Sequence, residues 1–119
     1  MRSDVSISVR NINDQVSAID IGGELTSFAE SELFAAVDQA NQEQTSCILL
    51  NFKELTYMNS SGIGLLVTTL IRLGRQEKRL VAVELRQHFR KIFMLTKLNE
   101  SIHLYDTEVE ALQSEGFID

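Results

Sequence analysis

The sequence contains no proline and no tryptophan, and one cysteine and two histidines occur among its 119 residues. The single cysteine, Cys47, excludes an internal disulfide, and one cysteine with two separated histidines lacks the ligand spacing of a zinc site. No apolar run approaches the roughly 18 residues that a membrane-spanning helix needs, and the N-terminus lacks the apolar stretch of a signal peptide. We therefore expect a cytoplasmic protein that uses no metal and no cofactor and does not enter a membrane.

Positive charge is also scarce. The chain has 11 Lys and Arg against 17 Asp and Glu, which gives a formal net charge of −6. Proteins that bind nucleic acid usually gather their basic residues on one face. The one dense basic stretch here, residues 72–79, instead has the pattern of a solvated helix end whose cations suit the helix dipole. Nucleic acid is therefore not an expected partner, whereas a basic protein partner is compatible with the acidic chain.

The chain opens with two predicted strands. Apolar and polar residues alternate over residues 5–10, which indicates a half-buried strand, and again over residues 16–21. Gly22 and Gly23 are expected to end the second strand, and the two strands are predicted to form a hairpin. The alternation in the second strand slips by one residue after Ala18, so this strand either contains a bulge or is covered on both faces.

The middle of the chain alternates between helical and strand patterns. Ser27 followed by Glu30 has the form of a capping box, and a helix is expected to start there. Its inward face is predicted from apolar residues at helical spacing: Leu33, Ala36, Val37 and Ala40. The apolar run CILLNF, residues 47–52, has the pattern of a strand that is buried on both faces.

A second helix is expected after this strand, with Gly74 just past its end. Its apolar residues recur at helical spacing and are predicted to face inward: Ile63, Leu66, Val67, Leu70 and Ile71. Residues 79–85 and 101–105 are predicted strands, and residues 86–98 are a predicted helix. That helix is expected to bury Phe89, Ile92, Phe93 and either Met94 or Leu95. Residues 107–110 have another capping-box pattern, before a last helix whose apolar residues are Val109, Ala111 and Leu112.

Alternating strands and helices after an opening hairpin are typical of parallel pairing with right-handed crossovers. We therefore predict the α/β class: a mixed β-sheet made of the hairpin and β-α repeats, with about four helices packed against it, in one domain over residues 1–119. In such folds, ligands and partners meet the loops beyond the carboxyl ends of the strands. The predicted loop at residues 56–60 follows the buried strand and lies at that edge.

The stretch YMNSSGIGLLV places two hydroxyl groups directly ahead of an apolar helix. Asn and Ser are preferred N-cap residues, so Asn59, Ser60 and Ser61 have a structural interpretation in which they start the helix. Gly62 and Gly64 would let its first turn lie close against a neighbouring strand or loop. The other interpretation is that the hydroxyls are presented for chemical modification, and their position at the functional edge favours it.

A catalytic serine is not expected in this stretch. A hydrolase elbow has glycine two residues on each side of its serine, and Met58 occupies the earlier position relative to Ser60. A nucleophile also needs a nearby base, whereas His88 and His103 stand in no triad pattern and suit half-exposed surface positions. The stretch also lacks the lysine and the glycine spacing of a phosphate-binding loop. We expect no enzymatic activity.

Three segments resemble the bacterial anti-sigma factor antagonists, which are single-domain STAS proteins: GELTSFAESELFAAV, CILLNFKELTYMNSSGIGLLV and FRKIFMLTKL. The resemblance extends from about Val5 to Leu112. It is strongest in the central motif, where the family has an apolar strand, a short loop and the sequence Asp-Ser-(Ser/Thr)-Gly-(Leu/Ile)-Gly.

The resemblance implies a regulator that changes protein partners. In this family, an ATPase-type serine kinase that is also an anti-sigma factor phosphorylates the first serine after the acidic residue. That position is Ser60 here, with Ser61 as the alternative acceptor. The unmodified antagonist binds the kinase, phosphorylation prevents the binding, and a PP2C-type phosphatase reverses the modification. The partner-binding residues are then expected in two segments: Gly23, Glu24, Thr26, Ser27, Thr56, Met58, Asn59, Ser60, Ser61, Gly62 and Gly64.

Two positions depart from the family pattern. Asn59 replaces the aspartate before the serine. Thr26 stands at the aspartate position of the sequence Gly-Glu-Leu-Asp, which is common in the family. Both changes remove a carboxylate and concern the choice of partner more than the fold, because Asn caps a helix about as well as Asp. A second hypothesis is a STAS-like module that is not phosphorylated and acts as a scaffold or binds a small ligand. Residues 56–61 would then form a shallow pocket, with Asn59 as its hydrogen-bonding group.

Overall fold

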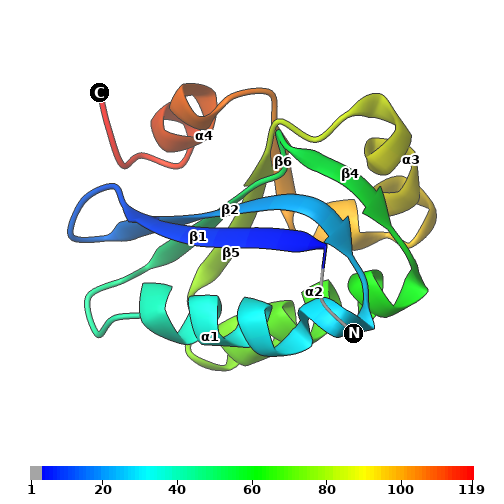
Figure 1. Cartoon of the computed structure of the whole chain (residues 1–119). Coiled ribbons are helices and arrows are strands. Elements are labelled where there is room, and N and C mark those ends of the chain that lie inside the picture. Colours follow the sequence, from blue (N-terminus) through cyan, green and yellow to red (C-terminus); the bar gives the residue numbers. More distant parts are fainter. Residues whose placement is uncertain (1–3) are drawn as a thin grey trace.

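A computed structural model describes residues 4–119 as a mixed β-sheet with helices packed against it (Figure 1). The strand order is β1-β2-β3-β5-β6, and β4 pairs with the second half of β2, beyond its pairing with β3. The strand bounds are β1 Val5–Asn11, β2 Val16–Leu25, β3 Cys47–Asn51, β4 Leu55–Met58, β5 Arg79–Val83 and β6 His103–Tyr105. β1 is antiparallel to β2, and the other pairings among these strands are parallel. The predicted α/β class is confirmed.

The helices are distributed around the sheet. Their bounds are α1 Glu30–Ala40, α2 Ser60–Arg75, α3 Gln87–Leu95 and α4 Glu108–Ser114, with short 3₁₀ turns η1 Ser27–Ala29 and η2 Leu98–Glu100. Figure 1 shows α1 and α2 against one face of the sheet, α4 against the other, and α3 beside β4 at the end of the sheet where α2 begins. The start of α2 therefore lies at the end of the sheet where β4 ends.

β2 is covered on both faces, which was one of its two predicted states. Val16 and Ala18 belong to the core beneath α4, whereas Ile19 and Ile21 belong to the core beneath α1 and α2. The slip in the hydrophobic pattern therefore reflects two cores rather than a bulge, and the β1–β2 register is regular at Ala18 and Ile19. Cys47 in β3 is buried as predicted, and burial raises the pKa of its thiol to about 12.

Two predicted boundaries near the site are wrong. β2 does not end at its glycines but continues to Leu25, with a bulge between Gly23 and Glu24. Residues 56–58 are not a loop but belong to β4, because the continuation of β2 supplies a partner for the backbone of this segment. The sequence pattern missed this strand because it is only four residues long and its buried and exposed residues do not alternate.

The predicted capping box at Ser27 and Glu30 is also wrong. Thr26 is the residue that caps, because its Oγ1 accepts a hydrogen bond from the backbone amide of Phe28 at 3.3 Å. Ser27 lies inside the 3₁₀ turn η1, and α1 begins only at Glu30. The predicted inward residues of α1 are all buried, so the error concerns where the helix starts and not which face it buries.

Other helical predictions are partly wrong. α2 continues through Gly74 to Arg75, and its buried stripe is Gly62, Leu65, Leu66, Thr69 and Leu73. Of the residues predicted to face inward, Ile71 is 48% exposed, Met94 62% and Leu95 84%. In α4, the apolar Val109 is 57% exposed. Phe89 and Phe93 are buried as predicted, and Ala111 and Leu112 in α4 are also buried. Apolar spacing thus predicts that a helix is present better than it predicts which apolar residues the helix buries.

A carboxylate anchors the end of α4 to the sheet. The side chain of Glu115 is 4% exposed, and it accepts hydrogen bonds from Tyr105 and Arg79 and lies 3.5 Å from the Nδ1 atom of His103. Burial opposes ionisation of Glu115, but the hydrogen bonds from Tyr105 and Arg79 outweigh burial and lower its pKa below the ordinary value of 4.5. The hydrogen bond that Tyr105 donates to Glu115 raises the pKa of Tyr105 to about 12. Glu115 is therefore an ionised link between α4, β5 and β6.

Candidate functional site

Asn59 starts α2, as the sequence predicts. Its backbone is extended, with φ −110° and ψ −176°, and its Oδ1 atom accepts a hydrogen bond from the backbone amide of Gly62 at 3.0 Å. Its backbone carbonyl accepts a second hydrogen bond from the amide of Ile63, also at 3.0 Å. Because Asn59 uses its side-chain oxygen for capping, Ser60 and Ser61 are not needed as caps.

Ser60 and Ser61 lie on the surface in the first turn of α2. Both are exposed, and neither hydroxyl takes part in a hydrogen bond within residues 4–119. Their backbone amides likewise have no acceptor in that part of the chain. The first turn of α2 contains no acidic residue. The start of this helix therefore combines free hydroxyls, free amides and the positive end of the helix dipole.

Gly62 holds this turn against the sheet. A Cβ atom added to Gly62 would lie 2.1 Å from the carbonyl oxygen of Leu25, at the end of β2. The backbone amide of Asn59 donates to that same oxygen, with an N–O distance of 3.4 Å. Gly62 is thus a close-approach position, as predicted. The same prediction for Gly64 is wrong, because Gly64 is exposed and nothing lies within 4 Å of its added Cβ.

The ends of β2 and β4 form the surface next to Ser60. Glu24 is opposite Tyr57 in the parallel pairing of these strands, and the Oγ1 atom of Thr56 donates to the carbonyl oxygen of Gly23 at 3.1 Å. Gly23 has φ +77°, and a Cβ there would lie 2.1 Å from the carbonyl oxygen of Asp4, so this position requires glycine. The structure therefore brings together the two segments that were expected to bind a partner.

The expected partner-binding residues differ in how accessible they are. Glu24, Ser27, Thr56, Ser60, Ser61 and Gly64 are exposed, Gly23, Thr26 and Asn59 are partly buried, and Met58 and Gly62 are buried. Met58 is 6% exposed, so its side chain packs in the core and cannot make the contact expected of it. Gly62 acts through backbone packing alone.

Two apolar side chains on the same segments were not singled out from the sequence. Phe28 in η1 is 58% exposed and Tyr57 in β4 is 49% exposed. Their position inside the two segments expected to bind a partner could have indicated that they are exposed contacts. They were missed because an aromatic side chain is usually assigned to the core. We define the switch surface as Glu24, Phe28, Thr56, Tyr57 and Ser60.

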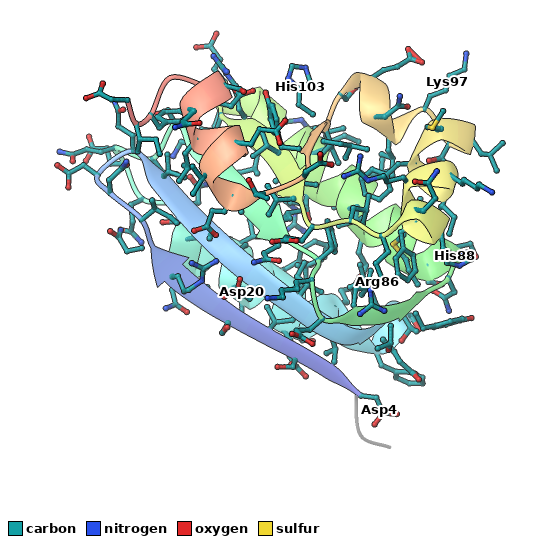
Figure 2. The ribbon with its side chains drawn as sticks, turned by 90° about the horizontal axis from the view of Figure 1, so that it is seen from above. Asp4, Asp20, Arg86, His88, Lys97 and His103 are labelled. Atoms are coloured by element: carbon teal, nitrogen blue, oxygen red, sulfur yellow. The ribbon has the colours of Figure 1, made fainter. Side chains whose placement is uncertain are left out.

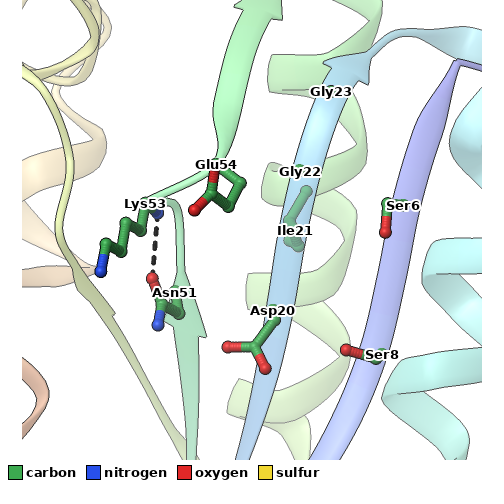
Figure 3. Close-up of a pocket in the computed structure, with 9 residues that line it drawn as sticks. All are labelled: Ser6, Ser8, Asp20, Ile21, Gly22, Gly23, Asn51, Lys53 and Glu54. Atoms are coloured by element: carbon green, nitrogen blue, oxygen red, sulfur yellow. Dashed lines mark hydrogen bonds between the residues drawn. The ribbon is translucent and has the colours of Figure 1, made fainter.

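A hollow of about 360 Å³ lies elsewhere, on the face of the sheet where β1, β2 and β3 meet (Figure 3). Ser6, Ser8, Asp20, Asn51 and Lys53 are among its lining residues, and none of residues 56–61 lines it. The ligand hypothesis expected a pocket at residues 56–61 with Asn59 as its polar group, but Asn59 uses its oxygen to cap α2. Within residues 4–119 there is no group of His, Cys, Asp and Glu side chains that could hold a metal ion.

Comparison with known proteins decides the family. The STAS domain profile matches residues 8–111. The chain belongs to the STAS domain family. An anti-sigma-B factor antagonist of Staphylococcus aureus is 32% identical over 98 residues, which are 82% of this chain and 91% of that protein. The resemblance to anti-sigma factor antagonists is thereby confirmed.

Solved STAS structures share the fold. The anti-sigma factor antagonist SpoIIAA in its unphosphorylated form superposes with a TM-score of 0.74 at 25% identity, covering 95% of this chain and 100% of that one. Its phosphorylated form, described as a Bacillus cell fate determinant, gives a TM-score of 0.66 at 23% identity, covering 92% and 98%. Among the described residues of this STAS protein, no helix is long and apolar enough to cross a membrane.

Proposed function

We propose that this protein is a single-domain anti-sigma factor antagonist, over residues 1–119, that changes partners when Ser60 is phosphorylated. The observation that carries the proposal is the exposed Ser60 hydroxyl, free of hydrogen bonds within residues 4–119, at the start of a helix that Asn59 already caps. Unmodified, the protein binds an anti-sigma factor that is also an ATPase-type serine kinase. The phosphorylated form is released, and a PP2C-type phosphatase restores the first form in the cytoplasm.

The start of α2 can accept a phosphate without loss of the fold. A phosphoserine adds about −1.5 to −2 charges and three acceptor oxygens. The free amides of Ser60 and Ser61 and the dipole of α2 favour an anion there, and the first turn has no carboxylate to repel it. The modification therefore alters the surface while Asn59 and Gly62 keep α2 in place.

The same phosphate opposes binding of a partner. Phe28 and Tyr57 expose apolar surface on the segments next to Ser60, and a partner that covers them must also take Ser60 out of water. Removing a hydroxyl from water costs much less than removing a dianion, which carries a large desolvation penalty unless it is paired. The existence of SpoIIAA in phosphorylated and unphosphorylated forms supports a switch of this kind in a relative.

A kinase assay tests the proposal. The purified protein is incubated with ATP and the anti-sigma serine kinase of the same organism, and intact mass and peptide mapping then locate the phosphate. We expect one phosphate on Ser60, its loss in Ser60→Ala, and its retention in Ser61→Ala. Phosphate on Ser61 in the unaltered protein would contradict the assignment of the acceptor. If the kinase binds the protein but transfers no phosphate to it during the assay, the switch would be contradicted.

A further inference from the structure

α3 has an outer side that no other part of residues 4–119 covers. Lys91, Met94 and Leu95 are spaced by three and four residues and therefore share one side of the helix, opposite the buried Phe89 and Phe93. Met94 is 62% exposed and Leu95 is 84% exposed. These are the two most exposed large hydrophobic side chains within residues 4–119. We define the α3 outer face as Lys91, Met94, Leu95 and Lys97.

The charge of this segment is opposite to that of the whole chain. Residues 86–97 contain four Lys and Arg residues and no Asp or Glu, in a chain with a formal net charge of −6. Arg90 pairs with Asp106 at 2.6 Å. Lys91 and Lys97 form no ion pair in the part of the chain that the structure describes, and Figure 2 shows Lys97 pointing away from the body of the protein. Two unpaired ammonium groups thus flank two exposed apolar side chains.

The end of α3 is held in a defined conformation. The amide and the hydroxyl of Thr96 both donate to the carbonyl oxygen of Ile92, at 3.0 and 2.7 Å. Lys97 follows with φ +63°, in the left-handed region where glycine is the favoured residue after a helix. A lysine is less favourable than glycine in this conformation, but it sets an ammonium group two residues from Leu95. The backbone that carries the α3 outer face therefore has a defined end.

We propose that the α3 outer face is a docking surface for an acidic amphipathic segment of a partner protein. Leu95 and the flexible Met94 would contact the apolar side of that segment, and Lys91 and Lys97 would pair with carboxylates beside it. A second copy docking through the same face would bring like charges together. An anionic membrane would gain only two apolar side chains, which is little for stable anchoring. Charge complementarity therefore favours an acidic protein segment.

This surface lies at the same end of the molecule as the switch surface but does not depend on it. In Figures 1 and 2, α3 lies at the same end of the molecule as the beginning of α2, with His88 at the start of α3. A partner that covers Ser60 can therefore extend onto α3. Docking at α3 alone requires neither the Ser60 hydroxyl nor its phosphate, so the two proposals can fail separately.

A peptide titration tests the docking surface. The probe is a fluorescein-labelled helical peptide with leucines along one side and glutamates beside them, and its twin has lysines in place of the glutamates. We expect the full-length protein to bind the glutamate peptide, more weakly as salt rises, and to bind the lysine twin at least about tenfold more weakly. Met94→Ser with Leu95→Ser, and separately Lys91→Glu with Lys97→Glu, should each weaken binding by about tenfold or more. Ile71→Ser and Val109→Ser, at exposed apolar positions elsewhere, should leave it unchanged.

Several results would overturn this proposal. Equal affinity for the two peptides, unchanged affinity in the α3 variants, or no binding of the glutamate peptide would each do so. Binding to phosphatidylglycerol vesicles but not to the peptide would assign the face to a membrane. Sedimentation showing self-association that the α3 variants abolish would assign it to a second copy. Thermal unfolding confirms that each variant is folded, and Ser60→Ala should bind the peptide normally whatever the kinase assay shows.

Discussion

Gly62 in α2 lies so close to Leu25 in β2 that a Cβ atom on Gly62 would be 2.1 Å from the Leu25 carbonyl oxygen. This contact joins the helix that carries Ser60 to the strand that carries Glu24. The backbone amide of Asn59 reaches the same oxygen. The position of Ser60 relative to the switch surface is therefore set by backbone packing and not by the serine itself.

A methyl group at position 62 should accordingly disturb the protein. Gly62→Ala forces the first turn of α2 away from Leu25, and we expect a loss of about 1–3 kcal/mol in the free energy of unfolding. Gly64→Ala is the matched control, because nothing lies within 4 Å of its added Cβ and alanine favours a helix by up to about 1 kcal/mol. Urea unfolding measures both changes. Equal effects of the two substitutions would show that the close approach of Gly62 has no energetic role.

Asn59 should act mainly as a cap. Removing its Oδ1 atom leaves the amide of Gly62 without its acceptor, so Asn59→Ala should lower the free energy of unfolding by about 1 kcal/mol. Asn59→Asp keeps an acceptor and should restore the stability. Comparing the kinase reaction of Asn59→Asp with that of the unaltered protein also measures the effect of the missing carboxylate. If Asn59→Ala is as stable as the original, the capping role is wrong.

The link at Glu115 predicts how stability depends on pH. The folded-state pKa of Glu115 is lowered, so its contribution is fully present above about pH 4.5 and is lost as pH falls through the folded pKa. Glu115→Gln should cost about 1–3 kcal/mol at pH 7, and this difference should shrink in acid. Thermal unfolding of both proteins from pH 3 to pH 8 measures the difference. A gap that is constant over this range would show that the charge of Glu115 is not responsible.

At alkaline pH, the stability that Tyr105 contributes should fall as pH rises. The pKa of Tyr105 is raised from 10.0 to about 12, so the hydrogen bond from its hydroxyl contributes fully below pH 10 and is lost as pH rises toward 12. Tyr105→Phe should therefore be less stable than the unaltered protein at pH 8, and the gap should close above pH 10. Chemical unfolding at fixed pH values tests this. If the stabilities of Tyr105→Phe and the unaltered protein converge in acid but not in alkali, the pH dependence would be assigned to Glu115 alone.

The fold was largely predictable because its elements have strong local patterns. Two opening strands, the buried β3 and the apolar spacing of α1 each indicate one structure, and their order is typical of a mixed sheet. β4 was not predictable, because a four-residue strand depends on a backbone partner in β2 that no local pattern reveals. η1 was missed and the start of α1 was placed at Ser27, because the spacing of Ser27 and Glu30 is that of a capping box whereas Thr26 is the residue that caps.

Residues of the site were predictable where their role depends on their neighbours in the sequence. An Asn followed by two serines and a glycine indicates a helix start, and Asn59, Ser60 and Gly62 lie as expected. The burial of Met58 and the exposure of Phe28 and Tyr57 were not predictable, since they depend on which face of η1 and β4 meets the core. The exposed Leu95 was missed because a leucine at helical spacing is usually assigned to the core.

The central claim is that a phosphate on Ser60 changes which protein binds without changing the fold. The direct test is calorimetric titration of the anti-sigma kinase with the unmodified and the Ser60-phosphorylated protein, together with thermal unfolding of both. We predict an affinity at least about tenfold lower for the phosphorylated form, with helical circular dichroism and melting temperature nearly unchanged. Equal affinity of the two forms, or unfolding caused by the phosphate, would contradict the account.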